Sequence, residues 1–462
     1  MSTWLSFLGA ARTVTGSRFL LQNDTERVLV DCGLFQGGRK MKALNWEPFP
    51  AEPASLDAIL LTHAHIDHTG YLPRLVSEGF DGPIYATQAT CALLELLLPD
   101  AAYLQEQDAA YANKTGYSRH KPALPLFTSI DARDTLELLH PVDDDESINI
   151  GTLSASWMRS GHILGAGILQ LDVNGQSESR RIVFSGDLGR YDSEIMKPPE
   201  QVGRADILLV ESTYGGRLHT DDSIRSVLID FLNDVADEKS VLLIPAFAIG
   251  RTQQILFWIR KLQDEGSVPD LPVFIDSPMA VEASHIYCQF GDDHNLDVNL
   301  LMDERQCPLR CKETHFIKEV EESKELNTRP GPAIIISASG MCTGGRILHH
   351  LKWRLPDRRN RVLFIGYQAE GTRGRHLLNG KRSIRIHGKS VPVHAGIAQL
   401  DALSAHADMN ELITWITGFQ HQPSDIFIVH GELESSRALQ EELGRRLGWG
   451  AKLPNQFETI QL

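Results

Sequence analysis

The sequence predicts an α/β protein in which a layered first domain is interrupted by an inserted domain with a mainly parallel sheet. Three observations lead to this fold class: short β-rich runs early in the chain, strand-turn-helix units in its middle, and polar motifs that return near its end. At 462 residues the chain exceeds what one hydrophobic core organises, so two domains are expected. The expected boundaries are 1–212 for the first part, 213–392 for the insert and 393–462 for the completing part.

The first part of the chain shows strand patterns on either side of a helical segment. Short β-rich runs that end in polar or glycine residues predict strands within 5–10, 17–22, 27–33 and 57–64. Between about 85 and 140 the pattern turns helical, with apolar residues at helical spacing over 89–114. Strand signals return within 151–161, 167–173, 180–187 and 205–213. These runs predict the strands of a layered sheet.

The middle of the chain repeats a buried strand, a glycine-rich turn and an amphipathic helix. The pattern occurs at 241–250 followed by 251–262, and again at 333–345 followed by 346–355. Such units predict helices wound over a parallel sheet. After about residue 393 the motifs SAHAD and IFIVHGE are more similar in chemistry to the first part than to the insert. The simplest topology is therefore a discontinuous first domain that the C-terminus completes.

Composition limits the classes of protein that fit the chain. The formal net charge of −15 argues against indiscriminate nucleic-acid binding. Scattered cysteines suit a reducing cytosol and predict free thiols. Cys307, Cys311 and His315 form a lone triplet that lacks a fourth ligand, so we interpret the two cysteines as surface thiols rather than as a zinc site. The N-terminus lacks a basic signal region, and no apolar run approaches the ~18 residues of a membrane span. A soluble cytoplasmic protein is expected, with no membrane partner.

The strongest motif follows the predicted strand AILLT. It contains His63, His65, Asp67 and His68 within six residues, at a strand end where side chains can converge. Alternation places His63 and His65 on one side, and the turn beyond lets Asp67 and His68 face a neighbouring position. Nitrogen and oxygen ligands of this kind suit zinc, with manganese or iron as lesser options. A solvated polar loop is the alternative interpretation.

Four ligands so closely spaced cannot all reach one ion without strain, so further ligands are expected elsewhere. His162 follows a predicted strand in SGHILGAG, and Asp187 ends the run IVFSGD. Alone, each is more typical of a polar loop. Together with the cluster they indicate a metal site.

These motifs resemble the metallo-β-lactamase fold, an αββα sandwich whose signature is a strand-end Asp, H-x-H-x-D-H, a later His and a later Asp. Asp31, the cluster, His162 and Asp187 match in that order. The resemblance implies that His63, His65 and His162 hold one metal, that Asp67 and His68 help hold a second, and that Asp187 bridges both. It implies that Asp31 lies behind the ligands and orients the ligand loop rather than binding a metal itself. An ordinary strand-end Asp is the alternative.

The resemblance extends to the β-CASP nucleases, which insert a second domain and then return to complete the site. Their motifs A, B and C match Glu211 in LLVESTYG, His406 in LSAHAD and His430 in IFIVHGE. A histidine at motif C is associated with the RNA-processing branch, and here it can supply a nitrogen ligand to the second metal. A neutral core histidine is the alternative for His430.

The resemblance implies a two-metal hydrolase that cleaves phosphodiester bonds of single-stranded RNA. The expected cofactors are two Zn²⁺ per chain, with Mn²⁺ as the alternative, and a homodimer is left open. His406 is expected to donate a proton to the leaving oxygen, supported by Glu211, and Asp67 and Asp31 complete the catalytic set. The motif B sequence Ser404-Ala405-His406 leans toward endonuclease action. A 5′-exoribonuclease of the ribonuclease J type and a non-catalytic RNA-binding subunit are the alternatives.

A basic segment in the insert predicts where RNA phosphates bind. Between Arg346 and Lys389 there are twelve basic residues against two acidic ones, although a solvated basic face is the alternative. Arg251 and Arg346 begin predicted helices whose free N–H groups can receive phosphate oxygens. Arg373 and Arg375 are further candidates, and Ser404 is expected at the scissile phosphate by resemblance only.

Overall fold

The computed structural model describes residues 2–116, 118, 120–143, 146–175, 179–219, 224–303, 306–366, 368–400 and 404–462. Two compact units make up the chain: unit 1 comprises Met1–Leu218 with His406–Leu462, and unit 2 comprises His219–Ala405. Unit 1 is discontinuous, and unit 2 is inserted into it, which confirms the predicted fold class. The domain boundaries at residues 212 and 392 stay a prediction beside these unit limits.

The first sheet of unit 1 combines antiparallel and parallel strands. Its strands lie in the order β21 (Glu458–Gln461), β1 (Trp4–Phe7), β2 (Phe19–Gln22), β3 (Arg27–Val30), β4 (Ala58–Leu60), β5 (Ile84–Thr87) and β6 (Leu139–Val142). Because β3 and β4 run parallel, the loops that follow them leave the same edge of the sheet. Asp31 begins one of these loops and His63 lies on the other.

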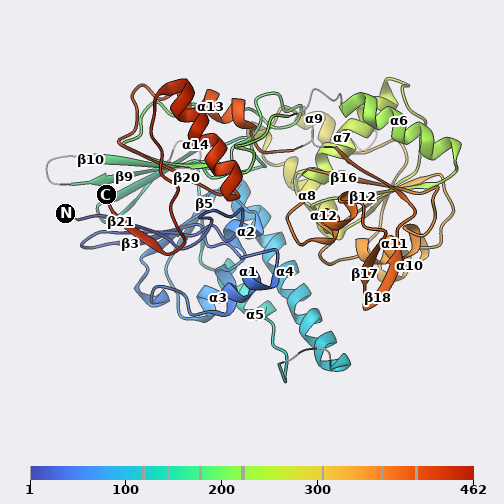
Figure 1. The fold of residues 1–462 in the computed structure, drawn as a ribbon, viewed down its shortest axis with the longest axis horizontal. Coiled ribbons are helices and arrows are strands. Elements are labelled where there is room, and N and C mark those ends of the chain that lie inside the picture. Colours follow the sequence, from blue (N-terminus) through green and yellow to red (C-terminus); the bar gives the residue numbers. More distant parts are fainter. Residues whose placement is uncertain are drawn as a thin grey trace. The chain divides into compact units, whose positions relative to one another are not determined.

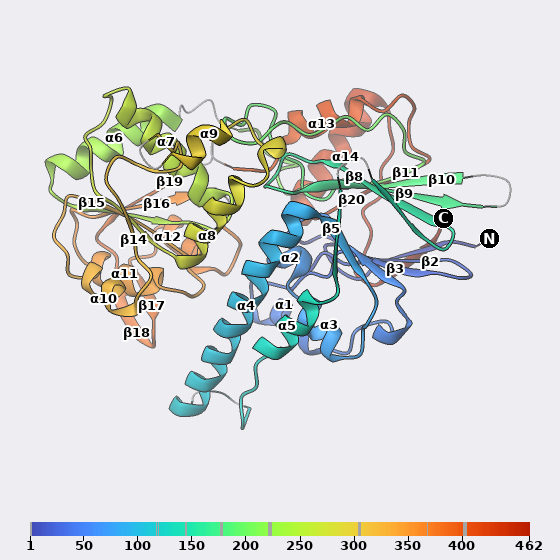
Figure 2. The same cartoon turned by 180° about the vertical axis from the view of Figure 1, so that it is seen from behind.

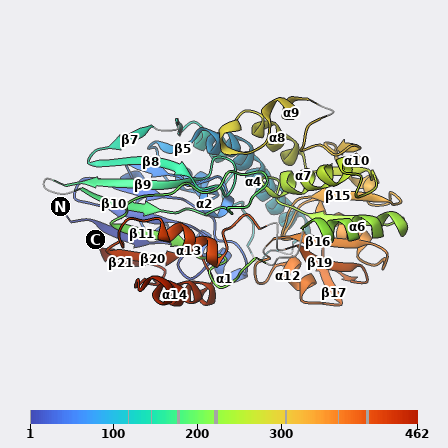
Figure 3. The ribbon, with the colours of Figure 1, turned by 90° about the horizontal axis from the view of Figure 1, so that it is seen from above.

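The second sheet of unit 1 incorporates a strand from the C-terminal part of the chain (Figure 3). Its strands lie in the order β20 (Asp425–Val429), β11 (Ile207–Glu211), β10 (Ser179–Phe184), β9 (Gly167–Asn174), β8 (Leu153–Arg159) and β7 (Ser147–Ile150). Strands β20, β11 and β10 are parallel, so their carboxyl ends share one edge. His430, Glu211 and Asp187 stand at this edge. The discontinuous topology is therefore what brings His430 beside the residues of the first part.

The two sheets of unit 1 pack face to face over an apolar core. Phe7 of β1 and Phe427 of β20 meet across it with ring centroids 5.2 Å apart, and Leu5 and Leu209 are fully buried in the same cluster. Inward-facing apolar residues of this kind alternate with outward-facing ones along each strand. Burying both inner faces stabilises the sandwich and fixes the two ligand-bearing edges against each other.

Helices cover the outer faces of the two sheets, which completes the αββα order (Figures 1 and 2). On the first sheet these are α1 (Arg39–Ala43), α2 (Ile66–Thr69), α3 (Leu72–Ser77), α4 (Gln88–Thr115) and α5 (Ser129–Leu136), with 3₁₀ turns at Leu44–Trp46 and Pro53–Ser55. On the second sheet they are α13 (Met409–Thr417) and α14 (Leu433–Leu447). A capping box of Asp408 and Glu411 starts α13, whose Leu412 and Trp415 are fully buried against the sheet.

Unit 2 is a parallel sheet with helices on both faces (Figures 1 and 2). Its strands lie in the order β14 (Thr314–Phe316), β13 (Val273–Asp276), β15 (Ala333–Ser337), β12 (Val241–Pro245), β16 (Arg361–Ile365) and β19 (Gly396–Leu400). One face carries α6 (Ile224–Asp237), α7 (Arg251–Asp264) and α8 (Pro278–Tyr287). The other carries α10 (Val320–Leu326), α11 (Ile347–Arg354), α12 (Arg373–Leu378) and the hairpin of β17 (Ser383–Ile386) and β18 (Lys389–Pro392). The same unit contains the short α9 (Val298–Met302) and a 3₁₀ turn at Gly291–Asp293.

The predicted strands and helices of both units are present, with two refinements. The segment between 85 and 140, expected to be helical, is bordered by strands β5 and β6, which lie side by side in the first sheet. The expected turn that carries Asp67 and His68 is the one-turn helix α2. Within the described ranges, no helix is both long and apolar enough to cross a lipid bilayer.

Candidate metal centre

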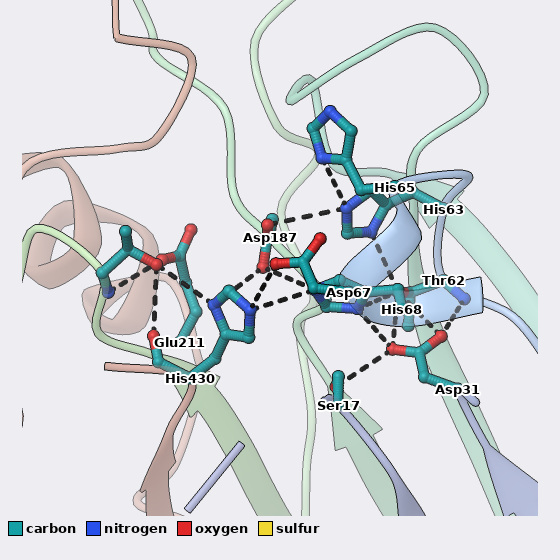
Figure 4. A network of polar contacts seen from close by, with 12 residues as sticks. Ser17, Asp31, Thr62, His63, His65, Asp67, His68, Asp187, Glu211 and His430 are labelled. Carbon is teal, nitrogen blue, oxygen red and sulfur yellow. Dashed lines mark hydrogen bonds and ion pairs between the residues drawn. The ribbon is translucent and has the colours of Figure 1, made fainter. Parts of the chain in front are cut away.

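The predicted ligands of unit 1 converge from loops at the carboxyl ends of strands, and Figure 4 labels all of them except His162. His63 and His65 follow β4, and Asp67 and His68 lie on α2 immediately after them. His162 follows β8, Asp187 follows β10 and His430 follows β20. Strand ends hold these short loops in place, which is why residues far apart in the sequence meet at one point.

One cluster of ligand atoms gathers around the first two histidines. His65 Nδ1 lies 3.1 Å from His63 Nε2 and 3.2 Å from His162 Nε2. Asp187 Oδ2 lies 3.5 Å from both Nε2 atoms. Each of the four residues offers one ligand atom, and these atoms all lie within 4.8 Å of one another. This is the set that the family resemblance assigns to one metal.

A second cluster lies on the opposite side of Asp187. His68 Nε2 is 3.2 Å from His430 Nε2, and His430 Nε2 is 3.5 Å from Asp67 Oδ2. Asp187 Oδ1 lies 3.4 Å from His68 Nε2 and 3.3 Å from His430 Nδ1. Asp187 therefore presents one carboxylate oxygen to each cluster, the arrangement expected of a bridging ligand.

The donor atoms fit divalent cations. Ring nitrogens face one another at hydrogen-bond distance in both clusters, and a cation between them can accept all their lone pairs together. Within the described part of the chain, Asp187 Oδ1 is buried and receives no hydrogen bond. A buried carboxylate oxygen without a donor is costly unless a cation satisfies it. The side chains thus form a site for divalent metal.

Electrostatics keep several ligands in their metal-binding protonation states. Burial lowers the pKa of His63 well below its ordinary value, and it lowers the pKa of His65 to about 4. Burial raises the pKa of Asp187, but the nearby His430 and His68 outweigh it, so the net pKa lies well below the ordinary value. The two imidazoles are therefore neutral and the carboxylate is ionised near pH 7, as metal binding requires.

The other two imidazoles lie beside several carboxylates. Burial lowers the pKa of His68, but Asp187 and Asp31 outweigh it and the net pKa is well above the ordinary value. Burial lowers the pKa of His430 as well, and Asp187 again reverses the sign, so that its pKa is raised. Both shifts show that this pocket attracts positive charge.

Asp31 supports both clusters from behind. His68 Nδ1–H donates to Asp31 Oδ2 over 2.7 Å, which turns Nε2 toward the second cluster. Thr62 donates its backbone N–H to Asp31 Oδ1 over 2.8 Å and its hydroxyl to Oδ2 over 2.9 Å, and its Oγ1 lies 3.1 Å from His63 Nδ1. With Nδ1 of His63 donating to Thr62, the lone pair of its Nε2 faces the first cluster. Asp31 adopts a left-handed φ of 57°, an uncommon conformation that clusters at functional sites.

Glu211 and His406 form a pair that adjoins both clusters, because His406 Nδ1 lies 3.9 Å from Asp187 Oδ2 and Glu211 offers an oxygen within 4.8 Å of ligand atoms of Asp187 and His430. His406 Nδ1 lies 3.2 Å from Glu211 Oε1, which also accepts the backbone N–H of Leu188 over 2.8 Å. Glu211 is fully buried, and the side chain of His406 is 16% exposed. The backbone of Gly189 pairs with that of His406 and so ties the motif B loop to the Asp187 loop. The structure therefore brings motifs A and B together, although 195 residues separate them in the sequence.

The residues expected to bind RNA lie in unit 2 and differ in what their side chains contact. Arg346 precedes α11 and donates to Asp276 Oδ1 over 2.7 Å and to the carbonyl of Lys318 over 2.8 Å. Arg373 donates to the carbonyls of Arg385, Cys342 and Thr343. These internal contacts give both arginines a structural part, and their RNA-binding roles stay predictions.

The remaining candidates have less internal support. Arg251 begins α7, as predicted, and donates to Gln254 Oε1 over 2.8 Å. Arg375 is partly exposed, and no described residue accepts a hydrogen bond from its guanidinium. Ser404 is buried, and its hydroxyl has no partner within the described ranges. The roles proposed for these three residues stay predictions as well.

The interpretation of Cys307 and Cys311 as surface thiols is wrong for Cys311. Its side chain is buried and its thiol lies near the carbonyl of Leu256, because it packs in the apolar cluster beside α7. All six cysteines are free, as predicted. His315 stacks on Phe274 and pairs with Glu313.

Two hydroxyl residues that contact the predicted ligands were not recognisable from the sequence. Thr62 links Asp31 to His63, and Thr213 Oγ1 lies 3.1 Å from His430 Nδ1, with its backbone N–H donating to Glu211 Oε2 over 3.0 Å. Both are neighbours of motif residues, but threonine is common in loops, so its type alone carried no signal. Gly186, with a φ of 54°, lets the Asp187 loop lie against Thr62, because an added Cβ would come within 2.9 Å of Cβ of Thr62.

Comparison with known protein families identifies the family of this chain. Residues 12–245 match the metallo-beta-lactamase superfamily, residues 252–377 match the Beta-Casp domain, and residues 390–454 match the Zn-dependent metallo-hydrolase RNA specificity domain. The chain belongs to the metallo-beta-lactamase superfamily, in its β-CASP branch. The family resemblance drawn from the motifs is thereby confirmed.

Relatives of this β-CASP chain extend over nearly its whole length. It is 37% identical over 441 residues to Ribonuclease TTHA0252 of Thermus thermophilus, which covers 95% of each chain. It is 30% identical to Transcription termination factor FttA of Methanocaldococcus jannaschii, over 99% of this chain and 71% of that protein. A crystal structure of a protein of unknown function from Enterococcus faecalis shares the fold, with a TM-score of 0.56 at 13% identity over the full length of both chains.

Proposed function

We propose that this β-CASP protein is a two-metal ribonuclease that hydrolyses phosphodiester bonds of single-stranded RNA. The observation that carries the proposal is the position of Asp187, whose two carboxylate oxygens face two separate clusters of ligand atoms. The RNA specificity domain at 390–454 and the ribonuclease relative support RNA as the substrate. Zinc suits the nitrogen-rich donor set, with manganese as the alternative.

Each cluster has a defined part in this proposal. His63, His65 and His162 hold the first ion, Asp67, His68 and His430 hold the second, and Asp187 holds both. When bound, two divalent ions would supply hydroxide near neutral pH and stabilise charge on the scissile phosphate. Asp31 keeps His68 and, through Thr62, His63 in the tautomers that ligate.

Proton delivery to the leaving group is assigned to His406. Hydrolysis expels a ribose alkoxide, a poor leaving group that benefits from a proton donated in the transition state. Glu211 accepts a hydrogen bond from His406 Nδ1, so the proton that reaches the leaving oxygen comes from Nε2. Glu211 is held in turn by the N–H groups of Leu188 and Thr213, which fixes the direction of the imidazole.

We propose that cleavage is endonucleolytic, because alanine, Ala405, precedes the motif B histidine. A circular RNA without ends tests this directly, because a 5′-exonuclease of the ribonuclease J type leaves it intact. Linearisation of the circle supports the proposal, and digestion of only the matched linear RNA with a free 5′ end favours the exonuclease. We further propose a cytoplasmic location and leave a homodimer for sedimentation to decide.

The central experiment incubates the purified protein with end-labelled single-stranded RNA and with DNA of the same sequence. We expect cleavage of RNA that a chelator abolishes and that zinc or manganese restores. The Asp187→Ala variant serves as the matched control for metal-independent contaminants. RNA binding without cleavage in the metal-loaded protein would overturn the enzyme assignment in favour of a non-catalytic RNA-binding subunit.

A further inference from the structure

A buried arginine lies next to the metal centre, outside the set of ligands and catalytic residues. Arg18 precedes β2 in unit 1 and is 3% exposed. Its guanidinium carbon lies 4.0 Å from the ring centroid of Tyr71 and 4.8 Å from that of Phe35. Arg18 Nε donates to the carbonyl of Gly33 over 2.8 Å, and Nη2 donates to Asn45 Oδ1 over 3.3 Å.

The environment of Arg18 is unusual because it lacks an acidic partner. Within the described ranges, Arg18 makes no ion pair; burial lowers its pKa, and Glu78 offsets this only from beyond ion-pair distance. A buried cation held only by carbonyl, amide and ring contacts recovers its lost hydration incompletely. A leucine or methionine of similar size would avoid that cost. The presence of a buried arginine here therefore needs a reason, and the segments that its hydrogen bonds join give one.

Arg18 holds a loop that lies directly on the second cluster of metal ligands. This loop, residues 32–35, follows Asp31 and is hydrogen-bonded to α2. The N–H of Cys32 donates to the carbonyl of His68 over 2.7 Å, and the N–H of Leu34 donates to the carbonyl of Ile66 over 3.0 Å. The backbone of α2, which carries two ligands, is thus positioned by the 32–35 loop.

Gly33 is where the loop and the ligands come closest. A Cβ at this position would lie 1.6 Å from the carbonyl oxygen of Asp67, so only glycine allows the contact. The carbonyl of Gly33 accepts from Arg18, and its N–H donates to the carbonyl of Ser17 over 2.9 Å. The N–H of Ser17 donates in turn to the carbonyl of Asp67 over 2.8 Å. Ser17 and Arg18 therefore bind the loop and α2 at the same time.

Asn45 closes the other end of the same loop. It accepts the N–H of Phe35 over 2.9 Å and donates to the carbonyl of Phe35 over 2.8 Å, while its Oδ1 also accepts from Arg18. The guanidinium thus joins Gly33 to Asn45 and spans the loop from one end to the other. The first cluster depends on this contact less directly, because His63 and His65 precede α2 and His162 and Asp187 follow other strands.

We propose that Arg18 is a positioning residue for the second metal ion, which acts by clamping the 32–35 loop against Asp67 and His68. This inference rests on the proposed two-ion centre. Arg18 touches neither metal nor substrate, so its effect passes through the orientation of the two α2 ligands. Its removal weakens the second ion selectively and leaves the ion held by His63, His65 and His162 bound.

Calorimetric titration of zinc into metal-free protein, with elemental analysis after dialysis, tests the proposal. In Arg18→Met we expect the Kd of the second ion to rise about 10- to 100-fold, as for lost supports of metal ligands, with the first Kd unchanged. Asp67→Ala gives the reference titration for a lost second ion. Arg18→Lys, which keeps the charge over Tyr71 and one donor, should fall between wild type and Arg18→Met. If Arg18→Met does not fold, the lysine variant decides by the same comparison.

A destabilised variant away from the centre separates positioning from general loss of stability. Leu153 is buried at the end of β8 opposite to the one that leads to His162, so Leu153→Ala lowers the melting temperature without touching the ligand loops. We expect it to bind both ions as wild type does. The role of Arg18 would be overturned if its variants bound both ions with wild-type affinity, or if Leu153→Ala lost the second ion to the same extent. Either result would leave the two-ion centre itself standing. A wild-type protein that binds fewer than two ions would overturn the two-ion centre as well.

Discussion

Asp187 is the residue on which the proposed centre depends most. Its oxygens lie 3.5 Å from His63 Nε2 on one side and 3.4 Å from His68 Nε2 on the other. Since a bridging carboxylate serves each ion, we predict that Asp187→Ala loses most of both metals. Elemental analysis of protein loaded with zinc measures this directly, with about two ions per chain expected for wild type.

The matched control for this prediction is an aspartate of the same unit away from the centre. Asp172 on β9 pairs with Arg181 at 2.7 Å on a partly exposed face. Asp172→Ala should keep the wild-type metal content. A wild-type preparation that stays metal-free after loading contradicts the centre itself, and an Asp187→Ala protein with two tightly bound ions contradicts the bridging role.

His406 allows metal binding and proton delivery to be separated by mutation. Its imidazole contacts Glu211 and lies 3.9 Å, measured from Nδ1, from Asp187 Oδ2, but it belongs to neither set of candidate ligand atoms. We predict that His406→Ala keeps both ions and RNA affinity yet loses ~10²–10⁴ in single-turnover cleavage rate, the usual contribution of general acid catalysis. Glu211→Gln should show a smaller loss of the same kind, because the amide still contacts Nδ1 but no longer fixes the donating tautomer.

The competing explanation is that Glu211 and His406 form a structural pair. In that case either variant lowers the melting temperature and the cleavage rate falls only with the folded fraction. Melting, metal content and cleavage on one preparation distinguish these outcomes. Loss of metal from His406→Ala would make His406 a ligand and would reopen the assignment of His430.

At the scale of single elements, the sequence predicted the site best where a buried apolar strand runs directly into residues with metal-binding side chains. The strand β4 and the cluster from His63 to His68 were recognisable because an apolar run ends in residues that are costly unless used. The network behind them was not recognisable, because Thr62, Thr213 and Arg18 become special only through tertiary contacts. The burial of Cys311 was missed for the same reason, since the cluster beside α7 forms only when distant strands assemble.

The short helix α12 carries two arginines of the basic segment, and their different contacts allow the predicted RNA binding to be tested one residue at a time. Its two arginines differ: Arg373 is held by three backbone carbonyls, and Arg375 has no described acceptor. We predict that Arg375→Gln weakens RNA binding and lowers the log–log salt slope by about 0.7, the value for one lost phosphate contact with a single strand. Binding measured across a salt series gives the slope.

Arg373→Gln is the companion variant on the same helix. Because its guanidinium bridges Arg385, Cys342 and Thr343, we expect a lower melting temperature with less change in salt slope than in Arg375→Gln. Metal content should be unaffected in both. An unaltered salt slope in Arg375→Gln would mean that Arg375 contacts no RNA phosphate and belongs to a solvated basic face.

At the scale of the whole molecule, the proposed metal ligands all belong to unit 1, and unit 2 is a separately cored parallel sheet. The last of these ligands, His430, comes from the segment that follows the insert, so the native centre exists only when both parts of unit 1 have assembled. An ion that binds this centre and not the unfolded chain stabilises the native state by RT ln(1 + [L]/Kd), about 2.7 kcal/mol at 100 times Kd.

We therefore predict that removing the metals lowers the stability of unit 1 and leaves that of unit 2 unchanged. Hydrogen exchange measures this by segment: with chelator, protection should fall in β11 and β20, whose ends carry Glu211 and lead to His430, and persist in β12 and β15. Added zinc should restore it in wild type but not in Asp187→Ala, whose bridging ligand is absent. Equal loss of protection in β12 and β15 would mean that the ions stabilise the chain as one cooperative unit, and an unchanged β20 would mean that His430 is no ligand.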